Sequence, residues 1–296
     1  MTGSLNERDW DILIQRINDK KCTPFLGAGA AYGVLPLGAD IAREWAQKYD
    51  YPLEDPSNLI AVAQFVALKI DPMAPKEEIV RMFEANTRAP NFADSCEPHR
   101  VLAGLPLPVY VTTNYDNFMS QALSKQNKDV RQELCRWNRF VRDHPSAFDG
   151  GFVPSVANPV VFHLHGYNPL AESLVLTEDD YLDFLVNISR DDTLLPPSIQ
   201  KAFVGTSLLF IGYRIADWNF RVLLRSLARF MEGGLKRTHF AVMTPPTASE
   251  ALKQKAQNYL SEYYENIDVR MYWGTATEFV KDLQLRLQQF SSLTRS

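Results

Sequence analysis

Three small clusters of residues that could carry chemistry each follow an apolar run typical of a buried β-strand. The clusters are Gly27-Ala28-Gly29, Thr112-Thr113-Asn114-Tyr115-Asp116 and His165-Gly166. Ligands of open α/β sheets lie outside the carboxyl ends of the strands, so three such strand ends could converge on one crevice. We expect that crevice to be the active site.

The glycine cluster is suited to a phosphate group. Backbone at Gly27, Ala28 and Gly29 can approach a pyrophosphate closely, and amide groups at a turn before a helix can bind it. A tight strand-to-helix connection without any ligand would use the same residues. The last glycine of the common dinucleotide fingerprint is also missing, because Tyr32 stands in its place. Alone, this cluster is a weak indication of a nucleotide site.

Asn114 and His165 are the candidate catalytic side chains. A carboxamide both donates and accepts hydrogen bonds, so Asn114 could hold a ribose hydroxyl and a water together, or serve only as a turn residue. His165 offers an imidazole that ordinarily titrates near neutrality, next to a glycine that allows close approach. Asp116 stands where the next helix should begin, and capping explains it without any ligand.

A metal site is also conceivable. His163 and His165 are two residues apart on one expected strand, which places both on the same face. No carboxylate or third ligand is evident, so we expect no metal. The three cysteines, Cys22, Cys96 and Cys135, lack the spacing of a zinc ribbon or a disulfide framework, and we interpret them as reduced thiols.

Strands alternating with helices must position these clusters. Apolar runs near residues 24–26, 109–111, 160–164, 208–212, 240–243 and 267–272 are followed or preceded by segments with helical periodicity. This alternation predicts an α/β fold, a Rossmann-like parallel sheet with helices on both faces. Residues 126–158 are mostly polar and indicate no clear element. We expect a single domain over residues 1–296, with a helical insertion at about 52–100 that packs beside the sheet and helps to roof the crevice.

Composition limits the classes of function. The chain has 296 residues, of which 46% are hydrophobic and 22% charged, enough for one large globular domain. Its formal net charge of −4 does not supply the basic field that binds a phosphate backbone, so we expect no direct nucleic-acid binding. No signal pattern and no apolar run of about 18 residues occurs, which predicts a cytoplasmic protein without membrane contact.

The three clusters resemble, in order and rough spacing, the signatures of sirtuins. The later segment Leu208–Trp218 is similar to that of a zinc-free bacterial branch of sirtuin-like NAD hydrolases associated with antiphage defence. The departures from sirtuin deacylases are specific. Both pairs of zinc-binding cysteines are absent, Ala31 replaces a serine, and residues 36–39 replace a Pro-Asp-Phe-Arg segment. These departures argue against peptide deacylation.

The resemblance implies NAD+ as substrate, cleaved at the nicotinamide glycosidic bond to give nicotinamide and ADP-ribose without zinc. Asn114 would orient the ribose and the attacking water, and His165 would act as the base. The implied NAD-binding residues are Gly27, Ala28, Gly29, Thr113, Asp116, Gly212, Tyr213 and Gly274.

The same resemblance implies restraint of the activity, through a homo-oligomer or a regulatory partner such as an ATPase, an Argonaute or a sensor. Two alternatives remain open. One is an NAD-dependent protein deacylase or ADP-ribosyltransferase, which would need an acceptor channel. The other is a non-catalytic subunit that binds NAD or ADP-ribose.

Overall fold

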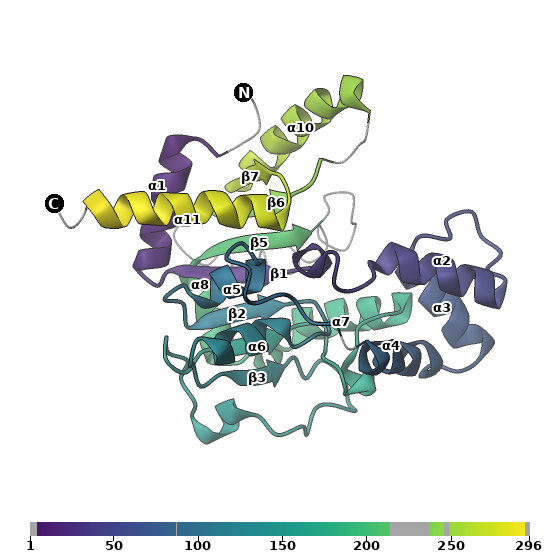
Figure 1. Ribbon diagram of the computed structural model, residues 1–296. Helices are drawn as coiled ribbons and strands as arrows, with labels where there is room; N and C mark the ends of the chain where they lie inside the picture. The colour runs from purple at the N-terminus through teal and green to yellow at the C-terminus, as the bar shows by residue number, and fades with distance from the viewer. Residues whose placement is uncertain (1–4, 87, 214–236, 246–248, 294–296) are drawn as a thin grey trace.

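A computed structural model describes residues 5–86, 88–213, 237–245 and 249–293. These residues form a seven-stranded sheet with helices around it (Figure 1). The strands are β1 Cys22–Leu26, β2 Val109–Thr112, β3 Arg131–Leu134, β4 Val160–His163, β5 Ser207–Tyr213, β6 His239–Met243 and β7 Val269–Trp273. Their order across the sheet is β3-β4-β2-β1-β5-β6-β7, and every neighbouring pair is parallel.

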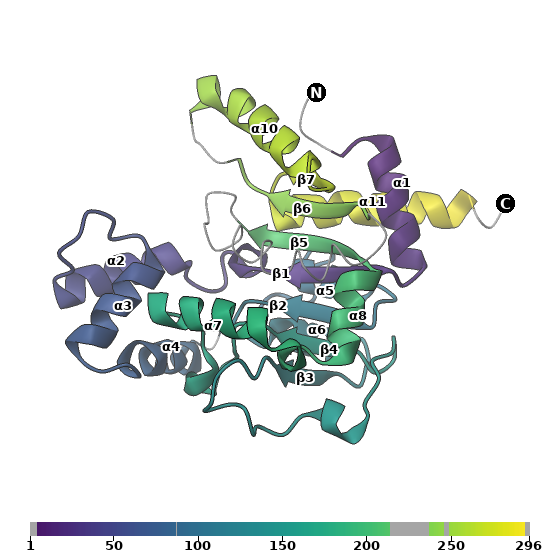
Figure 2. The ribbon, with the colours of Figure 1, turned by 180° about the vertical axis from the view of Figure 1, so that it is seen from behind.

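Helices cover both faces of this sheet (Figures 1 and 2). One face carries α1 Glu7–Asn18, α5 Pro98–Ala103, α6 Phe118–Lys125 and α11 Ala276–Leu293. The other carries α7 Glu178–Arg190, α8 Pro197–Gly205 and α10 Glu250–Glu265. The described residues also form four short 3-10 helices: η1 Ala28–Ala31, η2 Ala147–Gly150, η3 Ala171–Ser173 and η4 Asp192–Leu194. The expected Rossmann-like α/β fold is confirmed.

The central strands are buried on both faces, which explains their nearly continuous apolar sequences. In β5, Leu208 and Phe210 pack against the core under α7 and α8. Leu209 and Ile211 point the opposite way, into the core under α1 and α11. Strand periodicity therefore divides one apolar run between two cores.

A helical lobe, residues 38–85, projects from one end of the sheet (Figure 1). It consists of α2 Gly38–Tyr49, α3 Leu59–Lys69 and α4 Ala74–Ala85, and it has its own apolar core around Trp45, Val62 and Ile79. The described part of residues 52–100 contains α3, α4 and the start of α5, and no strand. Its status as an insertion into a single domain stays a prediction.

An ion pair between Lys76 and Asp180 joins the lobe to α7. Lys76 Nζ lies 2.6 Å from Asp180 Oδ1, and the two side chains are only 9% and 13% exposed. The second oxygen of Asp180 accepts a hydrogen bond from the Thr177 amide at 2.9 Å. The Asp180 carboxylate thus fixes the start of α7 and holds α4 beside it.

Replacing Lys76 with methionine should lower the free energy of unfolding by about 3 kcal/mol, because the Asp180 carboxylate is left buried without its cation. Denaturant titration would measure the loss. Lys48→Met is the matched control, since Lys48 pairs with Glu78 at 2.6 Å but its side chain is 50% exposed. We expect that variant to lose less than about 1 kcal/mol. Equal losses would contradict this role for the buried pair.

One region differs from the sequence prediction, and another lies outside the described residues. The polar stretch without a clear element contains β3, an edge strand whose Arg131 and Gln132 are exposed. The end of the segment Leu208–Trp218 from residue 214 on, and the helical segment expected after it, lie outside the described residues. Among the helices that the structure does describe, none combines the length and apolar character needed to cross a bilayer.

Candidate active site

The chain changes direction across the sheet between β1 and β5. After β1 it builds β2, β3 and β4 on one side, and it then returns to place β5, β6 and β7 on the other. The two turns that meet at this point are tied by a hydrogen bond of 2.8 Å from the Gly27 amide to the Ile211 carbonyl. Such a switch point is where open α/β sheets bind their ligands.

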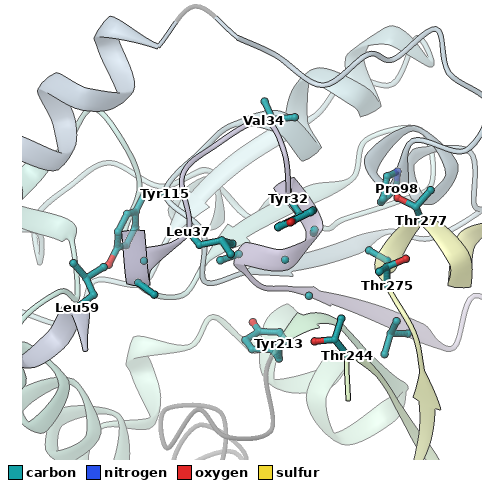
Figure 3. A pocket seen from close by; sticks show the side chains of 18 of the residues that line it. Tyr32, Val34, Leu37, Leu59, Pro98, Tyr115, Tyr213, Thr244, Thr275 and Thr277 are labelled. Carbon is teal, nitrogen blue, oxygen red and sulfur yellow. The ribbon is translucent and has the colours of Figure 1, made fainter. Parts of the chain in front are cut away.

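A cavity of about 1190 Å³ opens at this switch point (Figure 3). Ala28, Gly29 and Tyr32 line it after β1, and the lobe and α7 close one side. Figure 3 shows Tyr213, Thr244 and Thr275, from the ends of β5, β6 and β7, around the same space. Pockets for small ligands usually measure about 300–1,000 Å³, so a dinucleotide fits a cavity of this size.

Glycine is required where the two turns cross. Gly212 has a φ of +83°, and a Cβ there would lie 2.3 Å from the Ala30 nitrogen. A Cβ on Gly29 would lie 2.9 Å from the Gly212 Cα. The motif that we interpreted as a phosphate cradle therefore also has a packing role, because only bare backbone allows this approach.

Tyr213 connects β1, β2 and β5 beneath the cavity. Its hydroxyl donates a hydrogen bond of 2.9 Å to the Leu26 carbonyl and lies 2.9 Å from Thr113 Oγ1. Its ring lies against Gly27, where a Cβ would approach it to 2.9 Å. Thr113 and Tyr213, predicted from distant parts of the sequence, are thus in contact.

Asn114 is fixed to the glycine turn. Its Nδ2 donates a hydrogen bond of 3.0 Å to the Gly27 carbonyl, and its backbone amide donates to Thr112 Oγ1 at 2.9 Å. Within the described part of the chain, the carboxamide oxygen of Asn114 has no hydrogen-bond partner. That oxygen is available to a substrate hydroxyl or a water.

His165 lies at the carboxyl end of β4, packed against α7. Its ring meets Tyr181 and Phe184 edge-on, at centroid distances of 5.3 and 5.0 Å. It is 5% exposed, and burial lowers its pKa to about 3. No described residue forms a hydrogen bond with either ring nitrogen. The imidazole is therefore neutral and able to accept a proton or a hydrogen bond.

His163 differs from His165 in its surroundings. Its Nδ1 donates a hydrogen bond of 3.3 Å to the Asn114 carbonyl, and its ring lies 5.0 Å from that of Tyr167. Strand β4 ends at His163, so the alternation that placed both histidines on one face does not extend to His165. The described residues contain no group of three metal-ligating side chains.

Asn114 and His165 follow neighbouring strands. Thr112 of β2 pairs with His163 of β4, and the Leu164 amide donates to the Thr112 carbonyl at 2.8 Å. Neither candidate catalytic residue lines the cavity itself in this structure. Each is next to a tyrosine that does: Tyr115 follows Asn114 in the chain, and the Tyr181 ring packs edge-on against the His165 ring.

The predicted binding residues fall into two groups. Ala28, Gly29, Gly212, Tyr213 and Gly274 line the cavity. Gly27, Thr113 and Asp116 are not among its lining residues. The assignment of all these residues, with Asn114 and His165, to a bound substrate stays a prediction.

Asp116 caps a helix with one of its two carboxylate oxygens. Its Oδ1 accepts a hydrogen bond of 3.0 Å from the Phe118 amide at the start of α6. Its Oδ2 is buried and has no partner among the described residues. Burial raises the pKa of this carboxyl, opposed by the charge of His99. The structural role expected from sequence is present, and an acceptor remains for a ligand.

The helical insertion was expected to help roof the crevice, and residues of the lobe do line the cavity, but sequence reasoning did not identify those residues and missed the wall formed by α7. Asn58 and Leu59 of the lobe line the cavity, as do Glu178, Tyr181 and Leu182 of α7. The only signal for α7 was its capping pattern at residues 177–180, which located a helix start without showing what the helix faces.

Three buried histidines make stability depend on pH. Burial lowers the pKa of His163, His165 and His239 to about 4, 3 and 4. Unfolded histidines bind protons near pH 6.5, so stability should be full above about pH 7 and fall as the pH drops toward 4, by up to about 1.4 kcal/mol per pH unit for each histidine. Denaturant titrations between about pH 7 and pH 5 would measure this slope.

His239 offers the cleanest variant for that test. Its Nδ1 accepts a hydrogen bond of 3.0 Å from the Leu208 amide, which requires an unprotonated nitrogen. His239→Gln keeps an acceptor without a titrating group and should reduce the slope. His144→Gln, at an exposed position, should leave it unchanged. A slope that is the same in all three proteins would contradict the assignment.

A SIR2-like domain family matches residues 108–267. A relative named NAD(+) hydrolase ThsA, from Cytobacillus dafuensis, is 26% identical over 240 residues, covering 78% of this chain and 44% of the relative. A protein of the same name from Acinetobacter baumannii (strain 532279) is 23% identical over 238 residues, covering 78% of this chain and 44% of that protein.

A further relative is named Defense-associated sirtuin 2, from Bacillus subtilis. It is 27% identical over 173 residues, which cover 58% of this chain and 15% of the relative. The chain thus spans less than half the length of each of these curated relatives.

Proposed function

Because this chain belongs to the SIR2-like domain family, we propose that it hydrolyses NAD+ to nicotinamide and ADP-ribose as part of a bacterial antiphage defence. The observation that carries the proposal is that Asn114 and His165 follow adjacent strands, next to tyrosines that line a dinucleotide-sized cavity at the switch point. The names of the relatives support the reaction and its setting.

The reaction breaks the bond between ribose C1′ and the pyridinium nitrogen, and water supplies the new C1′–O bond. The bonding electrons leave with nitrogen, so nicotinamide departs neutral and the ribose develops oxocarbenium character. Little acid assistance is needed, and orientation and charge stabilisation dominate. The free oxygen of Asn114 would accept a hydrogen bond from a ribose hydroxyl or from the attacking water.

His165 would take the proton. With a pKa of about 3 in its buried site, the imidazole is a weak base. It is unprotonated at neutral pH and can accept a hydrogen bond. The developing positive charge on the ribose acidifies the ribose hydroxyl and the attacking water, so a weak base suffices at that moment. Tyr181 and Phe184 exclude bulk water from the ring and fix its orientation.

The remaining contacts would hold the rest of the dinucleotide. The pyrophosphate would lie on the turn of Gly27, Ala28 and Gly29, with Gly212 and Tyr213 beneath it. Thr113 and Asp116 would lie on the nicotinamide side and Gly274 on the adenosine side. No step of this mechanism involves zinc.

The same NAD+ site would serve a deacylase or an ADP-ribosyltransferase, and a non-catalytic subunit would bind NAD+ or ADP-ribose without turnover. One assay separates these functions: the purified chain is incubated with NAD+, with and without an acetylated peptide, and nicotinamide and ADP-ribose are quantified. Hydrolysis gives equal amounts of both products, independent of peptide. Peptide-dependent release indicates transfer, and stabilisation by NAD+ without release indicates binding alone.

We further propose a cytoplasmic protein whose activity is restrained by self-assembly or by a partner such as an ATPase, an Argonaute or a sensor. An unrestrained NAD+ hydrolase would deplete its own cell. Single-domain organisation, with the insertion at residues 52–100, belongs to the same proposal. Adding a candidate partner to the assay above should change the rate of nicotinamide release at constant chain concentration.

A further inference from the structure

The imidazole of His163 reaches from the end of β4 to the loop that carries Asn114. Its Nδ1 donates a hydrogen bond of 3.3 Å to the Asn114 carbonyl. Within the described part of the chain, that carbonyl has no other donor. The register between β2 and β4 ends with the pair Thr112 and His163, so the Asn114 carbonyl lies beyond the sheet ladder. A side chain therefore supplies the hydrogen bond that the ladder no longer provides.

Backbone hydrogen bonds hold the residues before and after Asn114. The Leu164 amide donates to the Thr112 carbonyl at 2.8 Å. The Asn168 amide donates to the Tyr115 carbonyl at 2.9 Å. At Asn114 itself the donor is the imidazole, so a change of that side chain can release Asn114 while both backbone hydrogen bonds remain.

Asn114 is fixed at every polar group except the one proposed to act on the substrate. Its amide donates to Thr112 Oγ1 at 2.9 Å, and its Nδ2 donates to the Gly27 carbonyl at 3.0 Å. Its carbonyl accepts from His163, and its carboxamide oxygen has no partner among the described residues. These three hydrogen bonds set the direction of that oxygen. Loss of the third lets the peptide group after Asn114 rotate.

The second ring nitrogen of His163 indicates which property this position requires. A carbonyl only accepts, so Nδ1 carries the hydrogen and Nε2 is an acceptor without one. Nε2 is buried and has no hydrogen-bond partner among the described residues. An unpartnered buried acceptor disfavours folding, and a phenylalanine ring would avoid it. The donor at Nδ1 is what phenylalanine lacks, which points to a role at Asn114 beyond packing.

We propose that His163 is a positioning residue, which holds Asn114 in the orientation needed for nicotinamide release. It acts through the Asn114 backbone and does not need to touch the substrate. His165 follows it by two residues, so one short segment fixes one candidate catalytic residue and carries the other. The catalytic consequence rests on the proposed function, whereas the placement of Asn114 can be measured without turnover.

Two substitutions separate positioning from packing. His163→Phe keeps a buried ring but removes the donor, and we expect kcat for nicotinamide release to fall by about 100-fold, as for a misplacement of about 1 Å. His163→Asn keeps a side-chain N–H donor near the place of Nδ1 but leaves a gap beside Tyr167, whose ring centroid lies 5.0 Å from that of the imidazole. We expect His163→Asn to be the less stable of the two in denaturant titration and yet to retain most of its kcat.

His239→Phe is the matched control. His163 and His239 are 1% and 5% exposed, and each uses Nδ1 for one hydrogen bond. The bond of His239 is accepted from the Leu208 amide, between β6 and β5, and His239 does not line the cavity. We expect this variant to lose stability and to keep its kcat. If kcat instead follows stability across the three variants, packing accounts for the losses and the inference is overturned.

The side-chain amide of Asn114 reports its placement without turnover. Its signals in nitrogen-15 correlation spectra are assigned by their absence in Asn114→Ala. We expect them to move in His163→Phe and to return close to their original positions in His163→Asn. Unchanged signals in His163→Phe would overturn the inference. If the signals move as expected while the unaltered chain releases no nicotinamide, the proposed hydrolysis fails and the positioning of Asn114 by His163 stands.

Discussion

Replacing His165 with alanine is expected to lower kcat for nicotinamide release by about 1000-fold, within the range for loss of a positioned base. The neutral ring is the proposed proton acceptor, and its nitrogens have no hydrogen-bond partner among the described residues. Nicotinamide release measured by chromatography would give the rate. The variant should still bind ADP-ribose, because the glycine turn and Tyr213 are unchanged.

Asn114→Ala should lower kcat for nicotinamide release by a similar factor, but for a different reason. It removes both the free carboxamide oxygen and the hydrogen bond of 3.0 Å to the Gly27 carbonyl, so binding should weaken along with turnover. His144→Ala and Asn117→Ala, at exposed positions outside the cavity lining, are the matched controls and should retain full activity. If activity appears and survives both His165→Ala and Asn114→Ala, the residue assignment is wrong.

Gly212→Ala is expected to destabilise the fold by more than about 3 kcal/mol and to abolish dinucleotide binding. The added Cβ would lie 2.3 Å from the Ala30 nitrogen and 2.8 Å from the Gly27 carbonyl oxygen, and the φ of +83° adds strain. The two turns at the switch point would have to separate, which removes the surface proposed for the pyrophosphate. Thermal unfolding and calorimetry with ADP-ribose would measure the two effects.

Gly151→Ala measures the cost of the left-handed backbone conformation without a steric clash of the added Cβ. Gly151 has a φ of +79°, and a Cβ there meets nothing within 4 Å. We expect this variant to lose only about 1 kcal/mol, the cost of the left-handed conformation, and to bind ADP-ribose normally. Similar losses of stability at both positions would show that the backbone conformation, and not the crossing of the turns, limits Gly212.

The parallel sheet could be predicted because its strands carry their own signal. Strands buried on both faces read as apolar runs, and β1, β2, β4, β5, β6 and β7 all correspond to such runs. Strand β3 has the opposite character. It lies at the sheet edge with Arg131 exposed, so its sequence resembles a loop and its pairing depends on β4.

The contact between Asn114 and the glycine turn follows from strand order. Both come after strands that are adjacent in the sheet, and an alternating strand-helix pattern places such ends together. The separation of His163 from His165 could not be predicted in the same way. It depends on the strand ending at His163, a boundary that the apolar run through Leu164 conceals.

The lobe and α7 walls depend on tertiary packing alone. Lys76 and Asp180 are 104 residues apart, and neither has a sequence neighbour that indicates the other. Their buried pair fixes α7, and Tyr181 on that helix covers His165. Sequence periodicity identifies each helix but carries no information about which distant helix it meets.

The most direct test is a crystal structure of the His165→Ala variant with NAD+ bound. We predict the nicotinamide ribose between Asn114 and the position vacated at residue 165, the pyrophosphate on the turn of Gly27, Ala28 and Gly29, and the adenosine at Gly274. A dinucleotide bound in the reverse direction, or outside the cavity at the switch point, would contradict the proposed active site.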